Sequence, residues 1–288
     1  MLRRFRLEEP ESIKDASDLL ARHGESARLY AGGTELLLAM KEGLVHCERL
    51  INIKKIPSLD QIKAENGSID IGALVTHRQL VESSVLRELL PAVVWMESDI
   101  ANIRVREVGT LGGNLCFAEP HADPGTLLLV LGAQLFATRG SSNREIPVEQ
   151  FFVDAYETCL KPDEILTGVR VPVPSRPSGV AYLKFGYLER PSVGVAVRIT
   201  LDQSRESIAD VRIAVGCAGP IPRRVEEAEG LLRGASLKEA APLVTQAGEI
   251  AGRGAEAISD LHGSQDYKEH IVGILLKRAF QQAREHCV

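Results

Sequence analysis

Two glycine pairs, far apart in the chain, constrain this sequence more than any other feature. The first lies in Ala31–Leu36 (AGGTEL) and the second in Thr110–Asn114 (TLGGN); each has a hydroxyl neighbour and lies beside an apolar, strand-like run. Glycine reaches positive φ and lets a ligand approach the backbone closely, and consecutive free N–H groups form an anion site. Each pair alone is better explained as a tight turn. Two matched pairs that meet in space instead favour a site for one diphosphate ligand.

Bulk composition narrows the class of protein. The 288 residues are 44% hydrophobic and 25% charged, as in a soluble globular protein with a full core. The net charge is −5 and no basic stripe stands out, which argues against nucleic-acid binding. No run approaches the length of a membrane span, and the apolar stretch at the N-terminus is too short for a signal peptide. We therefore expect a cytoplasmic protein without a membrane span.

The five cysteines form no C-x-x-C pair. Structural zinc and iron–sulfur sites need close ligand pairs, so we expect no metal on this chain. An odd, scattered set of cysteines suits reduced thiols. Cys116, just after the second glycine pair, is interpreted as a small packing residue rather than a redox group.

The first part of the chain alternates strand and helix patterns around the two glycine pairs. Apolar spacing predicts a helix over 11–23 with Ser12 as its cap. The expected elements that follow are a strand over 27–31, a helix over 36–41, strands over 49–53 and 68–73, a helix over 91–100, and strands over 134–138 and 165–171.

Residues 173–179 (VPSRPSG) are rich in Pro, Ser and Gly and form the best linker candidate. Three strand patterns with hairpin-like spacing follow it, over 181–185, 193–201 and 209–217. Helical patterns then cover 223–232, 237–248 and 267–285. The order of these patterns predicts a second unit made of an antiparallel sheet followed by helices.

Two common nucleotide motifs are missing from the chain: G-x-G-x-x-G and the P-loop pattern G-x-x-x-x-G-K-[ST]. A diphosphate would have to be held by uncharged backbone donors, assisted by Thr34, Thr110 and Asn114. No Ser–His–Asp set and no H-E-x-x-H zinc helix is present either.

Three polar residues between and after the glycine pairs allow two interpretations. Thr76 fits the N-cap of a helix, and His77 is better explained as a surface or capping histidine than as a catalyst. Asp123 is able to accept hydrogen bonds from ligand hydroxyls, as a sugar or ribityl chain offers, or to cap a helix that begins near Pro124. Both interpretations of Asp123 stay open.

Taken in order, these motifs resemble a known family. The pattern AGGT-[DE]-L, then IGA-x-[TV]-TH, then T-[IL]-GGN, then an aspartate nine residues later, is similar to the FAD-binding subunit of molybdenum hydroxylases. That family includes the medium subunit of aerobic carbon monoxide dehydrogenase and the FAD domain of xanthine dehydrogenase. The resemblance covers nearly the whole chain. Two mild departures are Glu35, where Asp is commoner, and Glu107, where Asn is frequent.

The resemblance implies an α+β fold. It implies a two-subdomain FAD-binding part (PCMH or vanillyl-alcohol-oxidase type) over residues 1–174, with subdomains of about 1–57 and 58–174. A smaller C-terminal domain, with an antiparallel sheet and helices, is implied over 179–288.

The resemblance also implies which residues bind FAD. The two glycine segments would wrap the diphosphate, Asp123 would bond the ribityl or phosphate region, and three further residues would lie near the flavin. There Lys184 would favour the anionic reduced form; its alternative is a solvated strand lysine. The full implied set is Leu29, Tyr30, Ala31, Gly32, Gly33, Thr34, Glu35, Leu36, Thr76, His77, Ile100, Thr110, Leu111, Gly112, Gly113, Asn114, Asp123, Leu166 and Lys184.

The function implied by the resemblance is electron transfer without a protein acid or base. A molybdopterin-containing large subunit would oxidise the substrate, and 2Fe–2S clusters on a small subunit would pass electrons to FAD on this chain. The acceptor would be a quinone, NAD or oxygen, and the assembly a dimer of heterotrimers. Two alternatives are a stand-alone flavin oxidoreductase and an FAD-binding assembly module without turnover.

Overall fold

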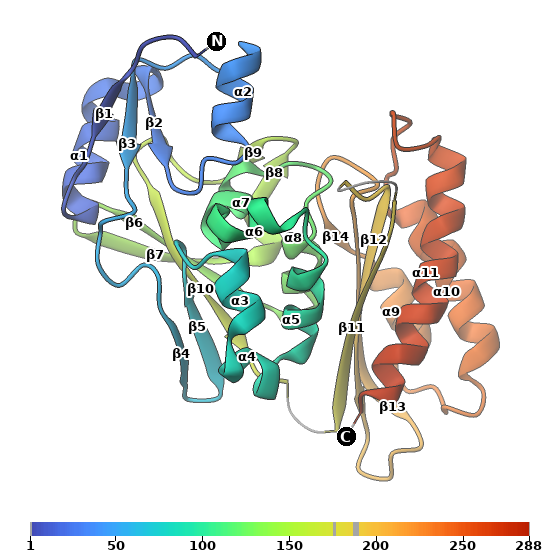
Figure 1. Cartoon of the computed structure of the whole chain (residues 1–288). Helices are drawn as coiled ribbons and strands as arrows, with labels where there is room; N and C mark the ends of the chain where they lie inside the picture. Colours follow the sequence, from blue (N-terminus) through green and yellow to red (C-terminus); the bar gives the residue numbers. More distant parts are fainter. Residues whose placement is uncertain (1, 175–176, 187–189, 288) are drawn as a thin grey trace.

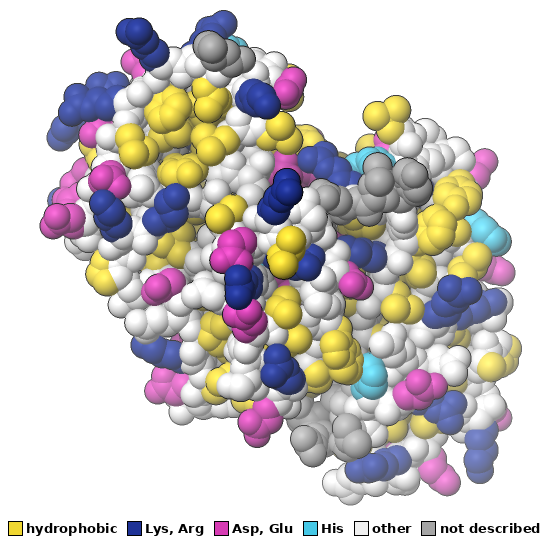
Figure 2. Space-filling view, viewed as in Figure 1, with side chains coloured by type: hydrophobic (Ala, Val, Ile, Leu, Met, Phe, Trp, Pro, Cys, Tyr) yellow, Lys and Arg dark blue, Asp and Glu magenta, His cyan; other side chains and the backbone are white. Residues whose placement is uncertain are grey.

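The computed structural model describes residues 2–174, 177–186 and 190–287. Figure 1 shows its layers: two sheets on one side, a group of helices beside them, then a third sheet, and finally the C-terminal helices. No helix in the described part of the chain is both long and apolar enough to cross a bilayer. On the face in Figure 2, Lys and Arg side chains are interspersed with Asp and Glu.

The N-terminal part is a small parallel sheet with a helix packed on it. Strand β3 lies in the centre and pairs in parallel with β1 and β2. Ser12 caps α1 as predicted, by accepting from the Asp15 amide. The elements are β1 (Arg6–Glu8), α1 (Ile13–His23), the 3-10 turn η1 (Gly24–Ser26), β2 (Ala27–Tyr30), α2 (Leu36–Glu42) and β3 (Arg49–Asn52).

The middle part is a five-stranded antiparallel sheet, in the order β4-β5-β10-β6-β7, covered by helices. Its strands are β4 (Ile62–Glu65), β5 (Ser68–Gly72), β6 (Gln134–Arg139), β7 (Ser142–Pro147) and β10 (Ile165–Pro172), with the short pair β8 (Phe152–Asp154) and β9 (Glu157–Thr158) beside it. Its helices are α3 (His77–Glu82), α4 (Ser84–Leu89), α5 (Pro91–Ser98), α6 (Ile103–Val108), α7 (Leu111–Phe117), α8 (Pro124–Leu131) and the 3-10 turn η2 (Val148–Gln150).

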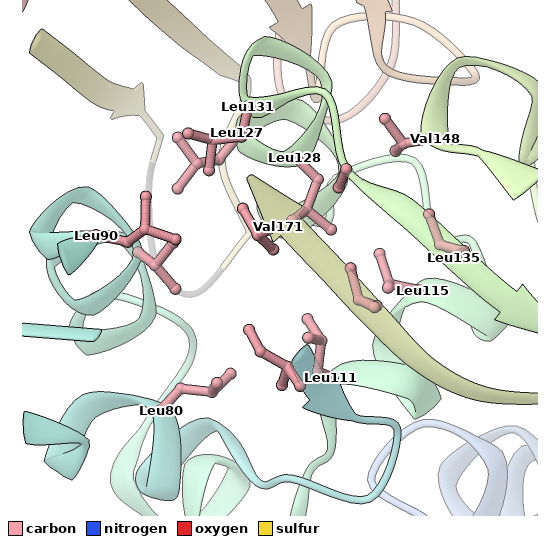
Figure 3. Close-up of a cluster of buried hydrophobic side chains, with 14 of the residues drawn as sticks. Leu80, Leu90, Leu111, Leu115, Leu127, Leu128, Leu131, Leu135, Val148 and Val171 are labelled. Carbon is pink, nitrogen blue, oxygen red and sulfur yellow. The ribbon is translucent and has the colours of Figure 1, made fainter. Parts of the chain in front are cut away.

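Helix α8 lies at the centre of the molecule, and each of its residues is buried. A helix that is apolar all round is stable only inside a protein. It contacts the five-stranded sheet through β10 and the third sheet through β12 and β13. Figure 3 shows Leu127, Leu128 and Leu131 of this helix in the cluster of buried side chains that joins the layers.

The C-terminal part is an antiparallel sheet, as predicted, in the order β11-β12-β13-β14. Helices α10 and α11 pack together, and α11 packs on β11 and β12. The predicted helix over 223–232 starts later, because Arg223 and Arg224 pair with β13 as a short strand. The elements are β11 (Ser178–Phe185), β12 (Val193–Leu201), β13 (Ile208–Gly216), β14 (Arg223–Arg224), α9 (Glu226–Leu232), α10 (Ala240–Gly254) and α11 (Gln265–Glu285).

The predicted linker over 173–179 lies partly outside the described residues, and β11 already begins at Ser178. The predicted domain limits, 1–57, 58–174 and 179–288, stay a prediction.

Glycines keep α10 and α11 close together, which leads to a stability prediction. A Cβ on Gly252 would lie 2.6 Å from the Glu269 carbonyl oxygen, whereas a Cβ on Gly230 of α9 would meet nothing. We expect Gly252→Ala to lower the free energy of unfolding by about 1–3 kcal/mol through overpacking. The control Gly230→Ala should raise it by about 0.5–1 kcal/mol. Urea titration of both variants checks this; equal effects would contradict the close helix contact.

Candidate cofactor cleft

A cleft of about 580 Å³ lies where the two glycine segments meet. This volume lies within the usual range for cofactor sites. Its lining includes residues of β2 and the glycine segment after it, Ile53 just after β3, residues that follow β5, helix α7, the loop from Glu119 to Asp123, and the start of β10. Segments far apart in the sequence therefore build one site, as the two glycine pairs predicted.

The first glycine segment offers a row of free backbone donors. Gly33 has a positive φ of 75°, and helical hydrogen bonding begins only when the Leu37 amide donates to the Gly33 carbonyl. Within the described chain, the amides of residues 32–36 donate to no protein acceptor. All five residues line the cleft. Consecutive unpaired N–H groups form a concave site for an anion such as a diphosphate.

The second glycine segment differs from its prediction, because it is the start of helix α7 rather than a turn. Thr110 is its N-cap. The amides of Leu111, Gly112 and Asn114 donate to the carbonyls of Val75, Ala73 and Thr110, and the Gly113 amide donates to Thr110 Oγ1. The prediction that both glycine segments are turns with free backbone donors is therefore wrong for the second, in which the amides of residues 111–114 are all paired.

The second segment instead contributes an unpaired side-chain oxygen and open space to the cleft. Asn114 Oδ1 is buried without a hydrogen-bond partner among the described residues, and Asn114 lines the cleft. Buried polar atoms are nearly always paired, so this atom indicates a missing ligand. Gly113 is exposed to the cleft, and a Cβ there would meet only Thr110 Oγ1, at 2.8 Å. A large ligand thus fits against Gly113 only while no side chain is present.

The first glycine segment touches the backbone just before the second one. A Cβ on Gly32 would overlap the carbonyl oxygen of Val108 and lie 2.8 Å from the Gly109 Cα. An isolated antiparallel bridge between Thr76 and Thr110 holds α7 against the start of α3. These contacts fix the width of the cleft. They also explain why glycine is needed at position 32, apart from any ligand.

Thr76 caps α3 as predicted, within a complete capping box made with Gln79. His77 is not at the surface. It is 2% exposed, and its Nδ1 lies 2.6 Å from Oε2 of Glu97, which is fully buried on α5. Burial alone would lower the pKa of His77, but the charge and hydrogen bond of Glu97 outweigh it and raise that pKa. His77 also lines the cleft.

Asp123 and Lys184 form an ion pair at the cleft wall. Asp123 is the N-cap residue of α8, but its side chain makes no capping bond. Its carboxylate accepts from Lys184 Nζ at 3.0 Å and from the Tyr182 hydroxyl at 2.5 Å. Lys184 is therefore neither a solvated strand lysine nor part of the cleft lining. Two apolar residues predicted near the flavin, Ile100 and Leu166, are buried in the cleft wall.

Four predicted residues do not line the cleft: Tyr30, Thr76, Leu111 and Lys184. The ring of Tyr30 packs under Lys54 and beside Gly33. Leu111 is buried in the main core cluster. Cys116, expected to be packed, is instead exposed and lines the cleft. All the other predicted residues line the cleft.

Sequence reasoning missed an ion-pair network at the cleft. Arg190 contacts Glu35 of the first glycine segment at 3.2 Å and Glu119 at 3.4 Å. His121 lies 3.1 Å from both Glu119 and Asp260, and buried Lys268 lies 2.6 Å from Asp260. Charged residues so distant in the sequence give no local pattern that would pair them. The network links helix α11, through Asp260 and Lys268, to the cleft.

Comparison with known families agrees with this geometry. The profile described as the FAD binding domain in molybdopterin dehydrogenase matches residues 3–174. The chain belongs to this FAD-binding family. A second profile, the C-terminal domain of the CO dehydrogenase flavoprotein, matches residues 190–283. The protein is thus an FAD-binding oxidoreductase component, and both the α+β fold and the cofactor expected from the sequence are confirmed.

The chain is similar to several relatives over nearly their whole length. The nicotine 6-hydroxylase medium subunit of Paenarthrobacter nicotinovorans is 33% identical, over 97% of each chain. The xanthine dehydrogenase FAD-binding subunit of Escherichia coli is 30% identical, over 94% of this chain and 93% of its own. A structure of carbon monoxide dehydrogenase from Hydrogenophaga pseudoflava, which lacks the Mo-pyranopterin moiety, superposes with a TM-score of 0.96 at 31% identity and full coverage of both chains.

Proposed function

We propose that this chain is the FAD-carrying electron-transfer subunit of a molybdenum hydroxylase. It would take electrons from the 2Fe–2S clusters of a small subunit and deliver them to a quinone, NAD or oxygen. A molybdopterin-containing large subunit would oxidise the substrate, in a dimer of heterotrimers working in the cytoplasm. The names of the relatives, a medium subunit and an FAD-binding subunit, support this division of labour.

One observation supports placing FAD in the cleft more than any other: the free amide row of residues 32–36 faces a cleft that has an unpaired Asn114 Oδ1. The amides would hold the diphosphate without a lysine. Thr110 and Asn114 would add side-chain bonds, and Gly113 would let the ligand lie against α7. Ile100 and Leu166 would exclude water from the apolar part of the cleft. Bound FAD supplies the redox chemistry, and the protein supplies its position and electrostatics.

The test is to isolate the tagged full-length chain from its own host. We expect iron, molybdenum and FAD to co-purify with it, together with a larger and a smaller chain identified by mass spectrometry. Omitting the tag from the same host gives the control for non-specific capture.

Other outcomes would contradict the proposal and select an alternative. An isolated chain that holds FAD and turns over a substrate by itself would be a stand-alone flavin oxidoreductase. A chain that binds FAD, carries no iron or molybdenum and stays inactive would be an assembly module.

A further inference from the structure

The Asp123 carboxylate already has two hydrogen-bond partners within the protein, which neither interpretation of the sequence predicted. It is 4% exposed and makes no bond to the helix that it precedes. Tyr182 donates to its Oδ1 at 2.5 Å, and Lys184 donates to its Oδ2 at 3.0 Å. A carboxylate offers about four lone-pair sites, so each oxygen keeps acceptor capacity for a further donor. Because Asp123 lines the cleft, that donor can be a bound ligand.

Both donors come from one face of strand β11. Tyr182 and Lys184 are two residues apart, so their side chains point to the same side of the sheet. A Cβ on Gly194 of the neighbouring strand would overlap the Tyr182 hydroxyl, so glycine there makes room for the tyrosine. Lys184 also donates to the Asp99 carbonyl at 2.8 Å, just after α5. Strand β12 thus leaves room for the Tyr182 ring, and the residue after α5 fixes the Lys184 ammonium group.

The surroundings of Asp123 shift its pKa in opposite directions. Burial raises its pKa, whereas the Lys184 charge and the Tyr182 hydrogen bond lower it, and the net shift is upward. The Asp99 carboxylate raises it further. The Tyr182 pKa is raised well above its usual range, mainly by burial, so this hydroxyl keeps its proton and acts as a donor. His77 and the buried Cys217 thiol also feel the Asp123 charge.

We propose that Tyr182 is a positioning residue for the cofactor. Together with Lys184 it holds the Asp123 carboxylate in a fixed orientation, with acceptor lone pairs directed at hydroxyl groups of the ribityl chain. A carboxylate repels phosphate, so this wall would hold the hydroxyl-bearing part of FAD and the amide row would hold the diphosphate. Lys184 acts on the cofactor through Asp123 rather than by direct contact. The inference rests on the proposed placement of FAD in the cleft.

The test compares FAD affinity across pH 5–9 for the full-length chain and three variants. Tyr182→Phe removes the hydroxyl and keeps the ring. Without the Tyr182 hydrogen bond the carboxylate is less fixed in orientation, so we expect about tenfold weaker binding at neutral pH. It is also protonated more easily, so the loss should grow toward acid pH, with the acid-side midpoint of binding about one pH unit higher. Lys184→Met should move that midpoint further in the same direction. Asp123→Asn should abolish the acid-side pH dependence.

Tyr267→Phe is the matched control, since Tyr267 lies half-exposed on α11 and its ring faces Phe185. It should bind FAD like the unmodified chain at each pH. Thermal unfolding of each variant separates loss of fold from loss of binding. A pH-independent loss in Tyr182→Phe, or an unchanged affinity, would overturn the positioning role while FAD binding itself stands. Failure of the unmodified chain to bind FAD would overturn the placement in the cleft and this inference together.

Discussion

Replacing Gly113 by valine is expected to abolish FAD binding while the protein stays folded. Gly113 lies in the first turn of α7 and is exposed to the cleft, with only Thr110 Oγ1 within reach of an added Cβ. The rest of a valine side chain would occupy the space in which we place the cofactor. We expect at least a hundredfold loss of affinity, or about 3 kcal/mol. The flavin content of the purified chain and calorimetric titration with FAD measure this loss.

The control for this substitution is Gly230→Val on α9. Gly230 is also a helical, exposed glycine, but a Cβ there meets nothing and lies outside the cleft. It should keep its FAD. The added side chain would disturb only the Thr110 cap of α7, so Gly113→Val should lower the free energy of unfolding by about 1 kcal/mol. A Gly113→Val protein that retained a full complement of FAD would show that the cofactor does not lie against α7.

Removing the carboxylate of Glu97 is expected to cause the largest loss of stability among the variants considered. His77 and Glu97 are almost entirely buried and lie 2.6 Å apart, on α3 and α5. Glu97→Ala leaves the imidazole buried without its partner, which costs about 3–5 kcal/mol when a buried pair is broken. Urea unfolding at pH 6 measures the loss. His77→Phe combined with Glu97→Leu should lose less, because no polar group is left unpaired.

The sign of the pH dependence follows from the raised pKa of His77. Stabilisation from a raised folded-state pKa is complete below the unfolded value, about 6.5 for histidine, and is lost as pH rises through the folded value. The stability gap between the unmodified chain and Glu97→Ala should therefore be largest near pH 6 and narrow by pH 9. A gap that widens with pH would contradict a protonated His77.

Local patterns in the sequence predicted local structure well. Ser12 and Thr76 cap their helices because capping depends on residues three positions away. The second glycine pair failed as a predicted turn for a non-local reason: the carbonyls of Val75 and Ala73 receive its first amides and let a helix begin. The local pattern contained no sign of these acceptors.

The candidate site was predictable only where its residues are close together in the sequence. The free amides of the first glycine segment belong to one continuous stretch, which a motif describes fully. The role of Asp123 depends on Tyr182, 59 residues later, and on Lys184, 61 residues later. His77 was misjudged because its partner Glu97 lies on another helix, 20 residues away. Burial of a polar side chain is decided by such distant partners, and one sequence does not show them.

Strand β11 of the third sheet supports the wall of the candidate cleft through Asp123, and this has an evolutionary consequence. An exchange between relatives near residue 174 would join an Asp123 from one parent to a Tyr182 and Lys184 from another. A hybrid that lost either donor would inherit a buried carboxylate with incomplete support. Selection should therefore favour exchanges that keep Asp123, Tyr182 and Lys184 from the same parent.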